Sequence, residues 1–170
     1  MPVQRNSRPA PTVEHQAATV ARLAEQIPAA PRAALGVGLW RSAVRAVDAY
    51  ESHLRRYGLS AGRFGLLLTL FGAEEEAVPP STVAQRVGVS RPTVTNLGQK
   101  LVAAGLVDRV SGGLCLSAAG RARMASVAPD HFGRLAAAVD ALTEEERATL
   151  QAALPVVSRF CEHLLAEEEA

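Results

Sequence analysis

The sequence predicts a mainly α-helical protein with one small β-hairpin. Three observations lead to this fold class: several long segments carry apolar residues at helical spacing, aromatic residues make up only 4% of the 170 residues while alanine is abundant, and two short apolar segments flank a Gly-Gly pair. Helical spacing of apolar residues is typical of amphipathic helices, and a Gly-Gly pair is typical of a tight hairpin turn. The expected architecture is therefore packed helices with a two-stranded hairpin.

The composition argues against several classes of protein. Hydrophobic residues make up 48% of the chain, which is enough for a packed core and too many for a disordered chain. The most apolar segment, Phe64–Ala73, is shorter than the roughly 20 residues of a membrane-spanning helix. Cys115 and Cys161 lack the spacing of a zinc site, and no catalytic motif is present in the sequence. We therefore expect a cytoplasmic protein that is not an enzyme and needs no cofactor or metal.

Residues 1–30 are predicted to form a polar tail with one possible helix, Thr12–Ile27, which prolines then interrupt. Arg32–Tyr57 is predicted as the first long helix, and Ser60 can cap a second helix that ends near Phe71. The second helix is almost wholly apolar, so we expect it to be buried at the centre of the fold. The first has one apolar stripe, which we interpret as core: Leu39, Ala43, Val47, Tyr50, Leu54 and Tyr57.

Two short helices joined by a glycine turn are predicted next, between residues 81 and 104. The first begins at Ser81 or Thr82, and Gly88 makes the turn. Ser90 is a suitable N-cap for the second helix, and Pro92 fits its first turn because the missing N–H is not needed there. This arrangement is typical of a helix-turn-helix. The inward face of the second helix is apolar (Val94, Leu97, Leu101), and the opposite face is polar (Arg91, Thr93, Thr95, Asn96, Gln99, Lys100).

A β-hairpin follows the second short helix directly. Leu106–Val110 and Leu114–Leu116 are the expected strands, and Val78 is expected to pair briefly with the hairpin. A hairpin in this place is the wing of a winged helix-turn-helix. Two long helices are then predicted, one capped by Ser117 and one that opens with a capping box formed by Thr143 and Glu146.

The charge of the chain is concentrated in this winged segment. Residues 81–123 have a net charge of +5, whereas the whole chain has a net charge of +1. Such a local excess of basic residues is typical of a surface that faces nucleic-acid phosphates. The excess comes from six basic residues against the single acid Asp108: Arg86, Arg91, Lys100, Arg109, Arg121 and Arg123.

The segment Val78–Arg109 closely resembles the MarR family of transcriptional regulators. Leu54–Ser60 and Leu116–Gly120 resemble the family as well, and the resemblance extends over most of Arg32–Leu165. It implies a homodimer that binds a palindromic site in double-stranded DNA, with residues 31–58 and 118–170 as dimerisation helices and residues 59–117 as the winged DNA-binding lobe. It also implies a cleft for a small phenolic or lipophilic effector that weakens DNA binding.

The sequence departs from the family pattern in the wing and in the second short helix. The family's wing is usually longer and carries an arginine near its tip, whereas this wing shortens to Arg109–Leu114. Asn96 stands where the family often has a basic residue, and Gly98 lies inside the helix at a cost of about 1 kcal/mol relative to alanine. The alternative function is therefore a winged-helix protein that binds a protein or ligand partner and binds DNA weakly or not at all.

The residues predicted to face DNA combine side chains that recognise bases with side chains that recognise phosphates. Arginine pairs with guanine, asparagine and glutamine pair with adenine, and lysine and arginine contact phosphates. Arg109 at the wing base either contacts phosphate or pairs with a neighbour such as Asp108. The predicted DNA-binding residues are Ser90, Arg91, Pro92, Thr93, Thr95, Asn96, Gln99, Lys100 and Arg109.

A second set of residues is predicted to line the effector cleft, although ordinary core or dimer packing is the simpler interpretation of each. The set is Trp40, Tyr50, Tyr57, Arg63, Phe64 and His131. For Cys115 and Cys161, ordinary packing is favoured over oxidant sensing. The sequence as a whole predicts a repressor whose DNA affinity is modulated by a small molecule.

Overall fold

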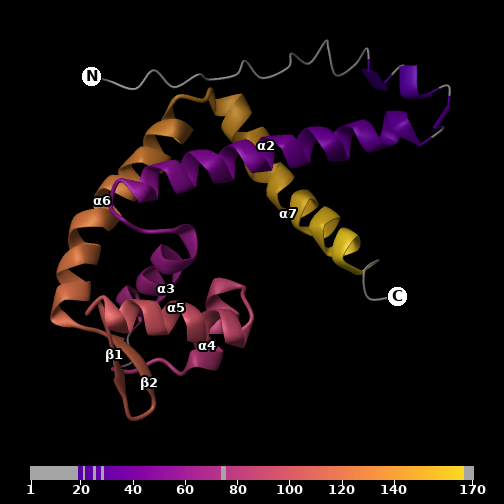
Figure 1. Cartoon of the computed structure of the whole chain (residues 1–170). Coiled ribbons are helices and arrows are strands. Elements are labelled where there is room, and N and C mark those ends of the chain that lie inside the picture. Colours follow the sequence, from indigo (N-terminus) through magenta and orange to yellow (C-terminus); the bar gives the residue numbers. More distant parts are fainter. Residues whose placement is uncertain (1–18, 21, 25, 28, 74–75, 167–170) are drawn as a thin grey trace, which may run out of the picture. The chain divides into compact units, whose positions relative to one another are not determined.

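The computed structural model describes residues 19–20, 22–24, 26–27, 29–73 and 76–166. These residues form helices and one two-stranded antiparallel sheet (Figure 1), which confirms the predicted fold class. The contacts within the chain define two units, residues 1–52 and residues 53–170.

The first unit contains the N-terminal part of helix α2 (Ala30–Arg55). The predicted long helix is confirmed, with each end shifted by two residues. Of the predicted helix Thr12–Ile27, residues 12–18, 21 and 25 lie outside the described residues, and residues 19–20 and 22–24 are helical. The interpretation of the α2 stripe as core is confirmed for Leu54, which is fully buried, and wrong for Ala43 and Val47. Ala43 is exposed and Val47 is 57% exposed.

Helix α3 (Ala61–Phe71) forms the centre of the second unit and contacts helices α4, α5 and α6 and strand β2, whose bounds follow. Ser60 caps it, as predicted, by accepting a hydrogen bond from the Arg63 N–H at 3.4 Å. Four of its apolar side chains are buried (Phe64, Leu66, Leu67, Leu70), which confirms the predicted central position, while its last residue, Phe71, is 42% exposed.

Helices α4 (Pro80–Val87) and α5 (Arg91–Ala103) form the predicted helix-turn-helix. Gly88 makes the turn in the left-handed region at φ 74°, a conformation that glycine adopts without steric cost. Helix α4 begins one residue before the predicted Ser81, because the fixed φ of Pro80 suits the first helical position.

Strands β1 (Val107–Val110) and β2 (Gly113–Leu116) form the predicted wing. Val78 joins it through two backbone hydrogen bonds with Leu114, at 2.8 and 2.9 Å, as expected. The backbones approach so closely here that a Cβ atom on Gly113 would lie 2.2 Å from the carbonyl oxygen of Val78. The root of the wing is therefore held against the segment before α4.

Helices α6 (Ala118–Asp140) and α7 (Glu144–Ala166) end the described chain. The predicted caps are confirmed. Ser117 Oγ accepts from the Gly120 N–H at 2.9 Å, and Thr143 and Glu146 form the reciprocal capping box, at 2.8 and 3.2 Å. Among the helices of the described ranges, none is both long and apolar enough to cross a membrane.

Candidate nucleic-acid interface

Helix α5 is anchored by one face and exposes the other. Val94 and Leu101 are each 1% exposed, so the helix is fixed on α3 and the wing by its apolar side. Eight of the predicted DNA-facing residues lie at its N-cap or along its outer face, and all eight are exposed: Ser90, Arg91, Pro92, Thr93, Thr95, Asn96, Gln99 and Lys100. The fold therefore gathers these side chains on one accessible surface.

Local hydrogen bonds organise the start of this surface. Ser90 Oγ accepts from the Thr93 N–H at 3.3 Å and lies 2.8 Å from the Thr93 hydroxyl. The Thr95 hydroxyl donates to the Arg91 carbonyl oxygen at 3.1 Å. The three hydroxyls are thus partly engaged within the helix, whereas the arginine and amide side chains are the groups suited to contact bases.

A hollow of about 630 Å³ lies between α4 and the start of α5. Its wall is formed by polar side chains and by the glycine turn, a surface on which a sugar-phosphate backbone can lie. The residues around it are Ser81, Thr82, Ala84, Gln85, Gly88, Val89, Ser90 and Arg91.

Arg109 lies on β1, which follows α5 within the same basic segment of residues 81–123. It is exposed, and within the described part of the chain it forms no ion pair with the adjacent Asp108. The wing tip, Ser111–Gly112, carries no basic side chain. Arg109 is therefore the only basic residue of the hairpin.

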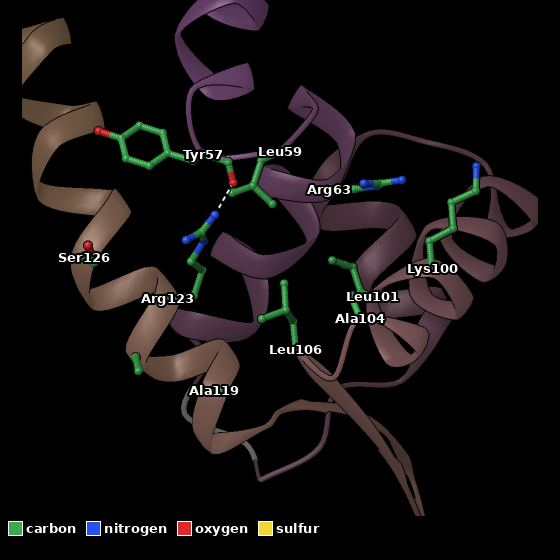
Figure 2. Close-up of a pocket in the computed structure, with 12 residues that line it drawn as sticks. Tyr57, Leu59, Arg63, Lys100, Leu101, Ala104, Leu106, Ala119, Arg123 and Ser126 are labelled. Atoms are coloured by element: carbon green, nitrogen blue, oxygen red, sulfur yellow. Dashed lines mark hydrogen bonds between the residues drawn. The ribbon is translucent and has the colours of Figure 1, made fainter.

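A cavity of about 620 Å³ lies on another side of the lobe, where α3, α5 and α6 meet (Figure 2). Arg63 and Lys100 lie on one side of it and Arg123 on the other, with Leu59 and Leu106 between them. The full lining is Tyr57, Gly58, Leu59, Arg63, Lys100, Leu101, Ala104, Leu106, Ala119, Ala122, Arg123 and Ser126.

The six residues predicted for an effector cleft are only partly brought together. Tyr57 and Arg63 line this cavity. Phe64 and His131 are buried against each other, with ring centroids 4.6 Å apart, and do not line it. The other two, Trp40 and Tyr50, lie on α2 in the first unit, and the cavity contains neither.

A polar cluster that the sequence analysis missed surrounds His53. The Tyr57 hydroxyl donates to the Asp130 carboxylate, and His53 Nε2 lies 3.4 Å from the same carboxylate. The hydrogen bond from Tyr57 holds the pKa of Asp130 below its ordinary value and raises that of Tyr57. Burial, with the nearby His53 ring, holds the pKa of His131 below its ordinary value. No local pattern links these residues, because Tyr57 and Asp130 are 73 positions apart.

The chain is similar to known DNA-binding regulators. Residues 60–111 match the helix-turn-helix domain of the IclR family. Over 104 residues, which are 57% of this chain and 62% of the relative, the chain is 30% identical to the HTH-type transcriptional repressor YetL of Bacillus subtilis (strain 168). The chain thus spans less than two thirds of that relative's length.

Solved structures with the same fold cover most of the chain. Sco5413, a MarR-family transcriptional regulator from Streptomyces coelicolor, aligns with a TM-score of 0.66 and 22% identity, over 78% of this chain and 96% of that one. NadR in complex with 4-hydroxyphenylacetate aligns with a TM-score of 0.59 and 20% identity, over 76% of this chain and 98% of that one.

Proposed function

Because the chain has the winged helix-turn-helix fold of the MarR-family transcriptional regulators, we propose that it is a sequence-specific DNA-binding regulator that acts as a repressor. The observation that carries this proposal is the exposed polar face of α5 within the segment 81–123, whose net charge is +5. The similarity to a transcriptional repressor supports repression rather than activation.

In the proposed complex, the N-terminal half of α5 enters the major groove of DNA. Arg91, Asn96 and Gln99 have the side chains that form paired hydrogen bonds with base edges, and Lys100 and Arg109 contact phosphates. The short wing supplies a phosphate contact from its base, and its tip does not place an arginine in the minor groove. The basic, polar surface of α5 argues against the alternative of a module that has lost DNA binding.

We propose further that the DNA-binding form is a homodimer. Several large apolar side chains on the two C-terminal helices are exposed in the single chain, namely Phe132, Leu135, Val139, Leu150, Leu154, Val156 and Leu164. A second copy of the chain would cover such a surface. Two α5 helices would then contact successive major grooves, about 34 Å apart, at a palindromic site.

The proposal includes modulation of DNA binding by a small phenolic or lipophilic effector. Its support is a cavity of about 620 Å³ in the same lobe as the DNA-facing helix. The neighbour NadR has been solved with a phenolic carboxylate, 4-hydroxyphenylacetate, bound to it.

The first test is selection of the purified protein on a pool of randomised DNA duplexes, at low and at moderate salt. We expect enrichment of a palindrome with half-sites one helical turn apart, and an affinity that falls steeply as salt increases because bound phosphates release counterions. Retention without an enriched motif would leave only nonspecific electrostatic binding. Absence of retention at both salt concentrations would contradict the proposal and favour the protein- or ligand-binding alternative.

A further inference from the structure

Helix α6 joins the winged lobe to apolar surface proposed for dimerisation. Its first part packs on α3 and β2 of the lobe through its buried residues, which are Gly120, Met124, Val127, Ala128 and His131. Its large exposed apolar residues follow directly, namely Phe132, Leu135 and Val139. Helix α5 packs on α3 as well. A bend of α6 at this change would therefore move α5 relative to the proposed dimer surface.

A proline lies just before this change. Pro129 is inside α6, and because proline has no backbone N–H, it cannot donate to the carbonyl oxygen of Ala125 one turn earlier. Prolines inside helices are the commonest sites of bending. The hydrogen-bond ladder of α6 is therefore interrupted close to where the buried part of the helix ends.

Tyr57 contacts α6 on both sides of this proline. Its backbone carbonyl oxygen accepts a hydrogen bond from the Arg123 guanidinium group (Figure 2), and its hydroxyl donates one to the Asp130 carboxylate. Arg123 and Asp130 are seven positions apart in the sequence. Residues at this spacing lie on one face of a helix, about 10 Å apart along its axis. The three residues thus form a brace across Pro129, the Tyr57 brace.

The brace is itself held in place by the turn and the packing around it. Gly58 adopts the left-handed region at φ 68°, which turns the chain directly after Tyr57. The Tyr57 ring packs edge-on against His53, with ring centroids 5.6 Å apart, and His53 is 4% exposed. His53 Nε2 also lies 3.4 Å from the Asp130 carboxylate. Tyr57 is therefore a fixed support for α6.

We propose that Tyr57 is a positioning residue: by bracing α6 across Pro129, it fixes the distance and rotation between the two α5 helices of the dimer, and hence the spacing of the half-sites that the dimer accepts. One additional base pair moves a half-site by about 3.4 Å and turns it by about 35° around the DNA axis. A dimer with a fixed α6 rejects this change, whereas a dimer with a bendable α6 tolerates it. The spacing step rests on the proposed function, and the brace does not.

The brace is tested by hydrogen exchange on the full chain. Tyr57→Phe should cause loss of protection of the α6 backbone amides around Pro129 and leave the protection of α5 unchanged. Asp130→Asn should keep the protection, because an amide oxygen still accepts from the Tyr57 hydroxyl, whereas Asp130→Ala should lose it. Wild-type protection of α6 in Tyr57→Phe would overturn the brace. An equal loss in α5, or in Asp130→Asn and Asp130→Ala, would overturn it as well.

The spacing step is tested with the duplex retained in the selection experiment and with duplexes whose half-sites are one base pair closer or farther apart. The wild type should bind the altered duplexes roughly 5- to 150-fold more weakly, as for the loss of one base contact. In Tyr57→Phe the ratio between the selected and the altered duplexes should fall towards one. A substitution that only destabilises the fold would lower all affinities by the same factor and leave this ratio unchanged.

Arg123→Gln should lower the ratio too, because it removes the other contact of the brace. Arg121→Gln is its matched control, since it removes one positive charge from an exposed position near the start of α6 and should leave the ratio unchanged. A wild-type ratio in Tyr57→Phe, an equal fall in both arginine variants, or a wild type without spacing preference would overturn the spacing step. A confirmed brace without any DNA binding would contradict the proposed function alone, so the two can fail separately.

Discussion

At the scale of single residues, the least expected feature is the pair of buried histidines. His53 and His131 are 4% and 3% exposed, with ring centroids 5.7 Å apart, and His131 also packs against Phe64. A buried imidazole is favoured in its neutral form, because burial makes the charged form costly. For His131, burial and then the nearby His53 ring lower the pKa of the imidazole.

This burial predicts loss of stability on mild acidification. The pKa of His131 is lowered in the folded protein, mainly by burial, while the unfolded chain keeps the ordinary value of about 6.5. The contribution of neutral His131 to the free energy of unfolding should therefore be fully present above about pH 6.5 and should decrease as the pH falls below this value. Urea unfolding of the wild type and of His131→Phe, at about pH 7.5 and 5.5, measures the effect. His131→Phe should lose much of the pH dependence of the free energy of unfolding. An equal decrease in that free energy for both proteins would show that His131 is not the group responsible.

Tyr57→Phe is the control for this measurement. It removes the hydrogen bond that chiefly lowers the pKa of Asp130. A carboxylate whose pKa is lowered by folding stabilises the protein at any pH above its ordinary pKa. This contribution is lost only as the pH falls below about 4. The variant should therefore retain the histidine-dependent change between neutral pH and about 5.5.

Arg91 is the residue on which the proposed base recognition depends most. It occupies the first position of α5 and is exposed. Arg91→Ala should weaken binding to the selected duplex by roughly 5- to 150-fold, since a paired arginine–base contact contributes about 1–3 kcal/mol. Fluorescence anisotropy at fixed salt measures this, with Arg159→Ala as the control for the lost charge. Wild-type affinity in Arg91→Ala would contradict the predicted recognition surface.

The residues of this surface could be predicted from the sequence because their pattern is local. Ser90, Pro92 and the polar positions after them follow helix-capping and periodicity rules within a few residues. The cavity and the His53 cluster could not be predicted in this way. The cavity joins side chains of α3, α5 and α6, and the His53 cluster joins the end of α2 to α6, so both depend on contacts between segments that are distant in sequence.

At the scale of elements, two glycines lie where the wing packs against its neighbours: Gly98 of α5 faces Leu114 of the wing, and Gly113 of the wing faces Val78. Gly98 is buried in α5, and a Cβ atom there would meet the Leu114 side chain of β2 at 3.4 Å, an ordinary contact. Gly113 is different, because its Cβ atom would overlap the backbone of Val78. From the sequence alone, Gly98 only lowers helix stability, whereas in the structure it faces the wing.

The two glycines predict opposite effects on stability. Gly98→Ala should stabilise the protein by up to about 1 kcal/mol, because alanine favours the helix and the contact with Leu114 is tolerable. Gly113→Ala should destabilise it by at least about 2 kcal/mol, because a backbone carbonyl cannot move aside easily. Denaturant midpoints of both variants at one pH test the pair. Destabilisation by Gly98→Ala as large as that by Gly113→Ala would show that α5 and the wing pack more tightly than described.

Helix starts could be predicted from the sequence where a capping residue marks them. Ser60, Ser117 and the Thr143–Glu146 box each place a helix start correctly. The start of α4 was predicted at Ser81 or Thr82, whereas Pro80 occupies the first helical position. The stripe of α2 shows a different limit, since periodicity identifies an apolar face but not what covers it.

At the scale of the whole molecule, the basic excess and nearly all large exposed apolar side chains lie in different segments of the chain. The basic excess lies between residues 81 and 123, whereas large exposed apolar side chains recur along α7, such as Leu150 and Leu154. This separation suits a protein that uses one surface for a polyanion and another for a copy of itself.

The proposed dimer predicts that Leu154→Glu yields a monomer. Leu154 is 58% exposed, so a charged side chain there should leave the single chain folded but destabilise an apolar interface. Sedimentation velocity at micromolar concentration should show a dimer for the wild type and for Gln151→Glu, which adds a negative charge at an exposed polar position of the same helix. A dimer that persists in Leu154→Glu would place the interface elsewhere.

The short wing also affects how this protein can evolve. Its root is fastened to Val78 by two hydrogen bonds, whereas at its tip a Cβ atom on Gly112 would meet no other atom within 4 Å. Insertions at such an open turn cost little, because loop entropy grows slowly with length. The length of the hairpin can therefore change in evolution while the rest of the lobe keeps its structure. Under the proposed function, a longer hairpin at this turn would add contacts with DNA that the present wing tip does not make, without a new fold.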